Sequence, residues 1–316
     1  MDRAIWRGYG IIGLTLLFLL VALPQTAWAS RESFWGAQEF YTRKGHLRYL
    51  LLRPPHYDPH RTYELWVNLH GSPGCASHAI YQYRLEAQQR DVFLLAPQAP
   101  ETDGIAYIRP DGRIDRYGFW NMRMDTRAVL TVLEDVQGRY PIDRNRIALL
   151  GFSAGCKMGW YLLAARPKLF CFFGGVANGF KHGHPPVSLK ALRLAARHVP
   201  HFYAAGQADP FAGPMFYGTV RRLRACGFEL RTAYPVGVGH DLPPSIKTPL
   251  LAFLDTVRAR QRREGIRQGE NSQALSRSAA HSRQAVFFVA ACDLMLSGWA
   301  FFRSPLRRRH RAPPIR

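Results

Sequence analysis

The chain has 316 residues, and 47% of them are hydrophobic, which suffices for the core of one large α/β domain and excludes a wholly disordered chain. Its 43 lysine and arginine residues against 22 acidic ones give a formal net charge of +21. This excess can indicate a nucleic-acid or anionic-surface partner, but much of it lies near the C-terminus, in RARQRREGIRQ and RSPLRRRHRAPPIR. No nucleic-acid-binding module accompanies the charge, so we expect no nucleic-acid partner.

The N-terminus has the pattern of an export signal. Two arginines precede the apolar stretch IIGLTLLFLLVAL, and the small residues of AWA, at 27–29, stand where a signal peptidase cleaves. An uncleaved anchor helix is the alternative, but the apolar run is short for a membrane span and is broken by Pro24. We expect residues 1–29 to be a signal peptide cleaved before Ser30, and the rest of the chain to be periplasmic or extracellular.

Between residues 45 and 260, short apolar runs alternate with segments of helical periodicity, which is typical of a mostly parallel sheet with helices on both faces. Helices are predicted over 125–140 with Asp125 as the N-cap, over 154–167, and over 248–261. The sequence therefore predicts an α/β fold in one domain, residues 30–263. Its strands are predicted at 46–53, 63–69, 91–97, 146–152, 171–177, 201–206 and 229–235.

The segment RIALLGFSAGCKMGW places Ser153 where a predicted strand turns into a predicted helix. A turn that sharp strains the backbone of the serine and crowds the positions two before and two after it, where Gly151 and Gly155 lack a Cβ. It would expose the hydroxyl and direct the helix N-terminus at an oxyanion formed there. The pattern GxSxG alone is common by chance, but this context favours Ser153 as a nucleophile.

A serine nucleophile needs a histidine base and a carboxylate, which follow such a turn in the order Ser, Asp or Glu, His. Asp209 lies after the strand at 201–206, and His240 lies after the next strand. Asp209 alone is also typical of a helix cap, and His240 alone of a turn. Their joint occurrence favours a catalytic triad with Ser153. Asp241 is a rival carboxylate, but it is poorly placed to reach the ring of its own neighbour.

An oxyanion hole needs two N–H donors, for which Ala154, after the nucleophile, and Ser72, after the strand at 63–69, are the candidates. Substrate selection is expected from the segment at 99–124. Its residues Tyr107, Phe119 and Trp120 would wall a pocket for an aromatic or acyl group; alternatively, they anchor an irregular loop to the core.

Cysteine and histidine spacings do not predict a metal site. Two histidines in HGH, at 182 and 184, are more typical of a surface loop than of a metal ligand pair. No metal or organic cofactor is expected. The predicted domain holds four cysteines, which allow three disulfide pairings that the sequence does not distinguish: Cys75, Cys156, Cys171 and Cys226.

Residues 45–260 resemble the α/β-hydrolase superfamily, and within it the secreted polyhydroxybutyrate-depolymerase and feruloyl-esterase-like serine esterases and their phospholipase/carboxylesterase relatives. The resemblance rests on YLLLRPPHYDPHRTYELWVNLHG, GRYPIDRNRIALLGFSAGCKMGWYLLAARP, GQADP and GVGH. It implies an exported serine hydrolase that cleaves small or polymeric carboxylic esters through an acyl-enzyme. The roles it implies are nucleophile for Ser153, acid for Asp209, base for His240, and oxyanion donors for Ser72 and Ala154.

Two other function classes remain open from the residues. An acyltransferase or a peptidase would use the same triad, because pocket shape decides which nucleophile attacks the acyl group. A catalytically silent binding protein on the same scaffold is the third class, and the intact set of three residues argues against it.

The C-terminal region has the pattern of a tether. Residues 264–283 have the composition of a polar linker, and residues 284–316 contain the apolar run AVFFVAACDLMLSGWAFF followed by an arginine-rich tail. This arrangement is typical of a stop-transfer segment, although Asp293 would be costly at the centre of a span. A helix packed on the domain and a poorly ordered extension are the alternatives.

Overall fold

The computed structural model describes residues 31–264, except 33 and 109–113. The chain divides into two compact units, Met1–Asp255 and Thr256–Arg316, and the described part of the second unit ends at residue 264. The expected signal peptide, the C-terminal apolar segment and all but the first residue of the expected polar linker lie outside the described residues.

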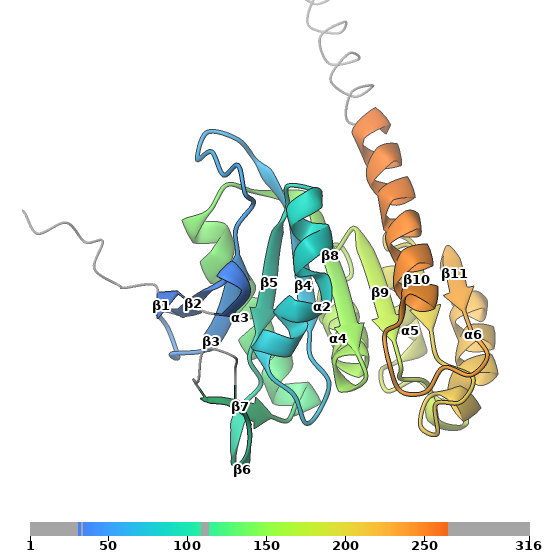
Figure 1. Cartoon of the computed structure of the whole chain (residues 1–316). Coiled ribbons are helices and arrows are strands. Elements are labelled where there is room, and N and C mark those ends of the chain that lie inside the picture. Colours follow the sequence, from blue (N-terminus) through green and yellow to red (C-terminus); the bar gives the residue numbers. More distant parts are fainter. Residues whose placement is uncertain (1–30, 33, 109–113, 265–316) are drawn as a thin grey trace, which may run out of the picture. The chain divides into compact units, whose positions relative to one another are not determined.

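One large sheet forms the centre of the first unit (Figure 1). Its strands are β1 (Arg31–Glu32), β2 (Gln38–Tyr41), β3 (Arg48–Leu52), β4 (Tyr63–Leu69), β5 (Phe93–Pro97), β8 (Ile142–Phe152), β9 (Phe172–Val176), β10 (His201–Ala204) and β11 (Leu230–Ala233). They lie in the order β1-β2-β3-β5-β4-β8-β9-β10-β11. The six strands from β5 to β11 in this order are parallel, and β1, β2 and β3 pair antiparallel. All seven predicted strands are present, and the predicted, mostly parallel sheet is confirmed.

Helices connect the parallel strands. They are α2 (Ala76–Gln89), α3 (Met122–Arg139), α4 (Ala154–Ala165), α5 (Leu189–Ala196) and α6 (Phe216–Ala225), and a last helix covers residues 244–264. The connections through α4, α5 and α6 step across the sheet in one direction, whereas α2 connects β4 to β5 in the opposite direction. Because such crossovers are right-handed, α2 covers one face of the sheet and α4, α5 and α6 the other (Figure 1).

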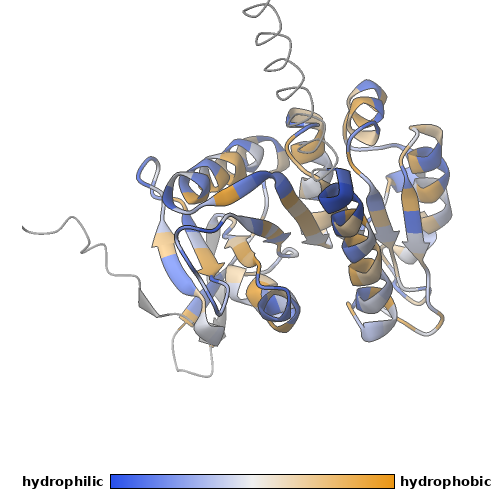
Figure 2. Ribbon diagram, turned by 90° about the horizontal axis from the view of Figure 1, so that it is seen from above, coloured by the Kyte–Doolittle hydropathy of each residue, from blue (hydrophilic) through white to orange (hydrophobic). Residues whose placement is uncertain are grey.

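The core lies on both faces of the parallel strands. Every residue of β4, β5, β9 and β10 is buried, as expected for a sheet covered by helices on both sides. In Figure 2 hydrophobic residues occur on both strands and helices, and the helices also carry hydrophilic residues. The helix α3, for example, buries Val129, Val132, Leu133 and Val136 on one face.

The N-terminus of α3 differs from the prediction. Asn121 is the N-cap, and its side chain accepts a hydrogen bond from the amide of Met124 at 3.3 Å. Asp125 lies in the first turn, where its carboxylate accepts a bond from the amide of Asn121 at 2.6 Å. The prediction that Asp125 is the N-cap is therefore wrong, because Asp125 bonds back to the capping residue from inside the helix.

A hairpin between β5 and α3 lies outside the main sheet and is not predicted by the sequence pattern. It consists of β6 (Glu101–Ile108) and β7 (Ile114–Gly118), which pair antiparallel. Asp115 of β7 is buried, and its carboxylate forms an ion pair with Arg48 of β3 at 2.7 Å and a hydrogen bond with the hydroxyl of Ser77 in α2. One side chain thus joins the hairpin to both neighbouring elements.

The four cysteines of the domain, Cys75, Cys156, Cys171 and Cys226, are all free and buried. Among the described residues, no helix combines the length and apolar character that a bilayer span requires.

Candidate active site

Ser153 lies at the predicted turn, between β8 and α4. Its backbone has φ 55° and ψ −119°, a strained conformation for a residue other than glycine. A Cβ on Gly151 would lie 2.5 Å from the carbonyl oxygen of Gly155, and a Cβ on Gly155 would collide with the carbonyl oxygen of Leu69. Both glycines are therefore required by close backbone contacts, for the reason that the sequence suggests.

Three side chains form a hydrogen-bonded chain at this turn. The Nε2 atom of His240 lies 2.9 Å from the hydroxyl of Ser153, and its Nδ1 atom lies 2.8 Å from a carboxylate oxygen of Asp209. The carboxylate is fully buried, whereas the imidazole is 28% exposed. The structure thus brings together the three residues that the sequence selects, from loops after β8, β10 and β11.

Backbone contacts hold the carboxylate of Asp209 in place. Its second oxygen accepts hydrogen bonds from the amides of Phe211 at 2.8 Å and Ala212 at 3.0 Å. The loop that carries Asp209 is also bonded to the loop that carries His240, through the amide of Ala208 and the carbonyl of Val238 at 2.9 Å. The two loops therefore position the acid and the imidazole as one unit.

The rival carboxylate, Asp241, makes a different contact. Its side chain is exposed and accepts a hydrogen bond from the amide of Leu242 at 2.7 Å. The imidazole of His240 is bonded to Asp209 instead.

Two aromatic rings that the sequence pattern does not single out flank His240. The ring of Phe152 lies 5.0 Å from the imidazole centroid, and the ring of Phe211 lies 5.4 Å from it. Phe211 is 68% exposed, so it offers an apolar surface beside the imidazole. Its place two residues after Asp209 is the signal that could have identified it.

The loop after β4 lies against the nucleophile. A Cβ on Gly71 would lie 3.3 Å from the Cβ of Ser153, so Gly71 packs against the nucleophile, and Ser72 is the next residue of the same loop. The amides of Ser72 and Ala154 make no hydrogen bond within the described part of the chain. Both are therefore available as donors to a negatively charged oxygen.

His70 fixes this loop, a role that the sequence pattern does not identify. The amide of Ala99 donates to its Nε2 atom at 3.1 Å, so the proton lies on Nδ1, which donates to the carbonyl oxygen of Gly71 at 2.6 Å. Burial lowers the pKa of His70 to about 4, so the ring is neutral near pH 7. The loop is thus held by an uncharged ring with both nitrogens bonded.

Trp120 completes this arrangement. Its indole stacks on the ring of His70 with centroids 4.7 Å apart, and its Nε1 atom donates to the carbonyl oxygen of His70 at 2.8 Å. Its amide donates to the hydroxyl of Ser72 at 3.3 Å. Trp120 therefore anchors its own segment to the loop beside the nucleophile, as one of the two sequence-based alternatives expects.

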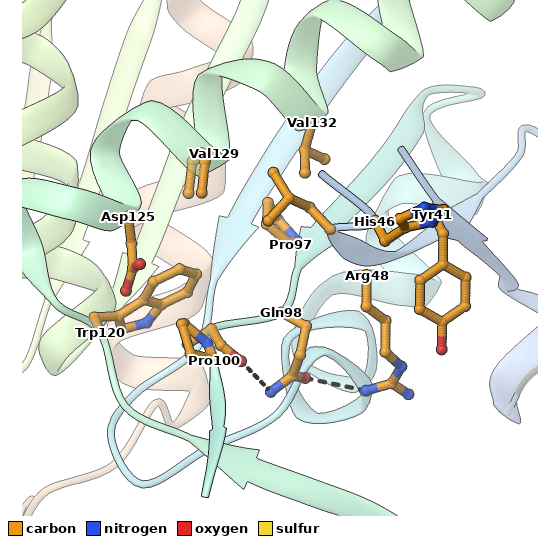
Figure 3. A pocket seen from close by; sticks show the side chains of 13 residues that line it. Tyr41, His46, Arg48, Pro97, Gln98, Pro100, Trp120, Asp125, Val129 and Val132 are labelled. Carbon is orange, nitrogen blue, oxygen red and sulfur yellow. Dashed lines mark hydrogen bonds between the residues drawn. The ribbon is translucent and has the colours of Figure 1, made fainter. Parts of the chain in front are cut away.

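Trp120 also lines a pocket of about 390 Å³ at the C-terminal end of β5 (Figure 3). Figure 3 shows Asp125 beside the indole at one end of the pocket, and Arg48 and Tyr41 at the other. Burial raises the pKa of Asp125 above its usual range. Trp120 therefore anchors its own segment and also lines this pocket, whereas its expected contact with a substrate stays a prediction.

Phe119 and Tyr107, the other two predicted substrate contacts, take no part in the hydrogen bonds of Trp120 described above. Phe119 is 44% exposed. The backbone of Tyr107 pairs with Asp115 in the hairpin, and its side chain lies outside the described part of the structure.

A second pocket, of about 420 Å³, opens next to the nucleophile. Gly71 and Phe152 line it where it meets the turn, Tyr81 and Leu85 of α2 line it farther away, and Lys247 lines it from the last helix. Its wall therefore combines aromatic, aliphatic and charged groups.

No family model matches the chain, and no curated protein matches it in sequence. Solved structures do match. A ferulic acid esterase from Anaeromyces mucronatus, in complex with ferulic acid, is 18% identical, with 70% of this chain and 93% of that chain covered and a TM-score of 0.51.

Two further solved structures give similar values. Esterase PE8 is 18% identical, with 66% of this chain and 97% of that chain covered and a TM-score of 0.52. A putative dienelactone hydrolase from Klebsiella pneumoniae subsp. pneumoniae MGH 78578 is 15% identical, with coverages of 70% and 98% and a TM-score of 0.52. This chain spans 61% of a thermostable esterase, at 19% identity and a TM-score of 0.48. The likeness to the esterases with scores above one half shows that the chain has the α/β-hydrolase fold.

Proposed function

We propose that the protein is a serine hydrolase that cleaves carboxylic esters through an acyl-enzyme intermediate. The observation that carries this proposal is the chain of hydrogen bonds from Asp209 through His240 to Ser153. The esterase fold of the structural neighbours supports it.

The chain of bonds supports a definite division of roles. A carboxylate can only accept, so Nδ1 of His240 carries a proton toward Asp209 and Nε2 is left to accept the proton of Ser153. The serine oxygen then attacks the ester carbonyl, His240 passes the proton to the departing alcohol, and water releases the acyl group by the same steps in reverse. Asp209 holds the ring in this tautomer throughout.

The negative charge that develops on the carbonyl oxygen is stabilised, in this proposal, by the amides of Ser72 and Ala154. The amide of Ala154 belongs to the first turn of α4, whose N-terminal dipole also favours negative charge there. Removal of one such donor typically lowers kcat by about a hundredfold or more.

The structure supports aromatic or apolar acyl groups as the first substrates to test. Phe152, Phe211 and the pocket along α2 present apolar surface near the nucleophile. Two structural neighbours are described as ferulic acid esterases, so we propose methyl ferulate and p-nitrophenyl butyrate as test esters.

Ser153→Ala tests the proposal directly. We expect the wild type to react with a fluorophosphonate probe and to hydrolyse both esters, and Ser153→Ala to do neither while keeping its thermal unfolding temperature. Asp209→Asn should lower kcat by a large factor, about 10⁴ in well-studied triads. Asp241→Asn is the matched control and should leave kcat near the wild-type value.

Hydrolysis that survives Ser153→Ala would refute the triad, and a wild type inert to the probe would favour a binding protein. Product analysis with added alcohol separates a hydrolase from an acyltransferase, because only the latter would form the new ester as its main product.

We also propose that the mature chain is exported and that its C-terminal apolar run tethers it to a membrane. The sequence patterns at the two ends of the chain support this proposal.

A further inference from the structure

Positive charge is concentrated on one part of the domain. From Ile147 to Phe228 the sequence contains ten lysine and arginine residues and one acidic residue, Asp209, which is buried at the candidate active site. The ten cations are Lys157, Arg166, Lys168, Lys181, Lys190, Arg193, Arg197, Arg221, Arg222 and Arg224.

These cations have no anionic partners in the described part of the chain. Apart from the contact between His240 and Asp209, the ion pairs among the described residues join residues outside 147–228. Examples are Arg90 with Asp255 and Arg139 with Asp135. The remaining ion pairs follow the same rule. The cations from Ile147 to Phe228 therefore form no ion pair with a carboxylate among the described residues.

Two neighbouring helices gather this charge into stripes. On α5 and its C-cap, Arg197, the exposed residues recur at helical spacing, opposite the buried Leu192 and Ala195. They are Lys190, Arg193, Leu194 and Arg197. On α6 the exposed residues Tyr217, Arg221 and Arg224 again lie on one face. We call these seven exposed residues the α5/α6 surface.

The two stripes belong to one surface. The helices α5 and α6 follow the adjacent parallel strands β9 and β10 on the same face of the sheet. Arg193 of α5 and Arg222 of α6 both act electrostatically on the thiol of Cys226, at the end of α6. Cations from both helices therefore lie close to one point.

We propose that the α5/α6 surface docks on an anionic lipid bilayer, through the phosphate groups of its lipids. Five of the seven residues are cations, which complement such a surface. The other two, Leu194 and Tyr217, are 43% and 71% exposed and would enter the interface between the headgroups and the acyl chains.

Charge argues against coverage of this surface by the protein itself. Residues 265–316 contain nine arginines and two acidic residues, so this segment would be repelled. A second copy of the chain would present the same positive surface. Charge therefore favours an anionic occupant.

The form of the surface favours a bilayer over a nucleic acid. Single-stranded nucleic acids are bound by grooves with aromatic rings on which bases stack. The α5/α6 surface is instead the outward side of two helices, and its one aromatic ring, Tyr217, packs edge to face against Phe216 and Tyr234. A leucine placed among cations matches a lipid interface better than a phosphate backbone.

Vesicle co-sedimentation of the full mature chain tests the proposal. We expect tighter binding to phosphatidylcholine vesicles that contain phosphatidylglycerol than to phosphatidylcholine alone, and weaker binding as salt is added. A patch variant changes four residues to glutamine, which should reduce the partition coefficient on anionic vesicles by at least about tenfold. The four changes are Arg193→Gln, Arg197→Gln, Arg221→Gln and Arg224→Gln.

A matched control removes the same charge elsewhere. It changes four exposed cations outside the surface, and its binding should stay within about twofold of the wild type. The four changes are Arg43→Gln, Lys44→Gln, Arg123→Gln and Arg127→Gln. Equal losses of binding in both variants would overturn the proposal, because net charge alone would then explain binding. Wild-type binding that does not increase with phosphatidylglycerol content would also overturn it.

Leu194→Ser distinguishes a bilayer from a nucleic acid. It should weaken binding to anionic vesicles and leave any binding to a DNA oligonucleotide unchanged. Tighter binding to the oligonucleotide than to the vesicles, lost in the patch variant, would overturn the proposal in favour of a nucleic acid. Hydrolysis of a soluble ester should be the same in all these variants, so the result is independent of the proposed activity.

Discussion

His70 shows how a single buried ring can set the geometry of the proposed oxyanion hole. Both of its nitrogens are bonded to backbone groups of two different loops, and its carbonyl oxygen is bonded to Trp120. The sequence marks His70 only as the end of a strand, because its partners Ala99 and Trp120 are distant along the chain. Such a positioning role depends on contacts that no local pattern encodes.

We predict that His70→Leu lowers kcat for ester hydrolysis by about ten- to a hundredfold, with little change in KM, because the amide of Ser72 is displaced where it serves the transition state. His70→Gln, which can accept from the amide of Ala99, should recover part of the loss. Steady-state kinetics with a soluble ester measures both values. A rise in KM as large as the fall in kcat would contradict the positioning role, and so would a kcat of His70→Leu equal to that of the wild type.

His201 should make stability depend on pH. Its ring stacks on Phe173, and burial lowers its pKa from 6.5 to about 4. The folded state therefore binds its proton less readily than the unfolded chain, so the full stability is present above pH 6.5 and is lost as the pH falls toward 4. The loss from this group is about 3 kcal/mol.

The Nδ1 atom of His201 lies 2.9 Å from the carbonyl oxygen of Phe173. We predict that His201→Asn, whose amide can also donate to this carbonyl, shows a shallower fall in the free energy of unfolding between neutral and acid pH. Urea denaturation at several pH values measures the slope. His198→Asn, at an exposed position, is the matched control. A slope that is the same in both variants would mean that His201 is not a source of the pH dependence.

At the scale of elements, the sequence predicts those parts of the fold whose burial shows in the sequence itself. The parallel strands are apolar runs because both of their faces are covered, and all seven predicted strands are present. The turn at Ser153 is predictable because it needs glycines at fixed spacing. The hairpin of β6 and β7 is not, since much of β7 is exposed and the partners of its buried residues belong to other elements.

Replacement of glycine by alanine should have opposite effects on the stability of the protein at two positions. Gly138 lies in α3, and no atom lies within 4 Å of the place that a Cβ would take, so Gly138→Ala should raise the free energy of unfolding by up to about 1 kcal/mol. Gly155→Ala should prevent stable folding, because its Cβ would collide with the backbone of β4. Thermal unfolding measures both. A stable Gly155→Ala protein would mean that the turn can shift.

The ion pair of Arg48 and Asp115 should be the main attachment of the hairpin. We predict that Asp115→Ala lowers the free energy of unfolding by about 3 kcal/mol, because it leaves a largely buried guanidinium with one carboxylate fewer. Asp143→Ala removes a partner of Arg146 from a more exposed pair and should cost less than about 1 kcal/mol. Urea denaturation measures both free energies of unfolding. Equal losses in the two variants would mean that the difference in burial does not determine the cost of breaking these ion pairs.

At the scale of the whole molecule, the sequence also selects the three residues of the site. From β8 to β11, strands that follow one another in the chain are neighbours in the sheet and run parallel. The loops after β8, β10 and β11 therefore reach the same edge of the sheet. The rings of Phe152 and Phe211 are missed because they join the site only through packing.

For the ends of the chain, we predict a mature N-terminus at Ser30 and retention in membranes through residues 285–302. N-terminal sequencing of the exported protein checks the first point. Alkaline carbonate extraction checks the second: a truncation after Glu264 should release a chain that the full-length protein retains. An intact Met1 form in the soluble cytosol, or release of the full-length mature chain, would refute the respective prediction.

The four free cysteines of the domain have a practical consequence for production of the protein. All are buried, and burial raises the pKa of the Cys75 thiol to about 12 and that of Cys156 well above its usual range, so both resist oxidation. With these four cysteines free, the described domain contains no disulfide that folding would have to form. It should reach its native state equally well in a reducing bacterial cytosol and in an oxidising compartment, without a disulfide isomerase.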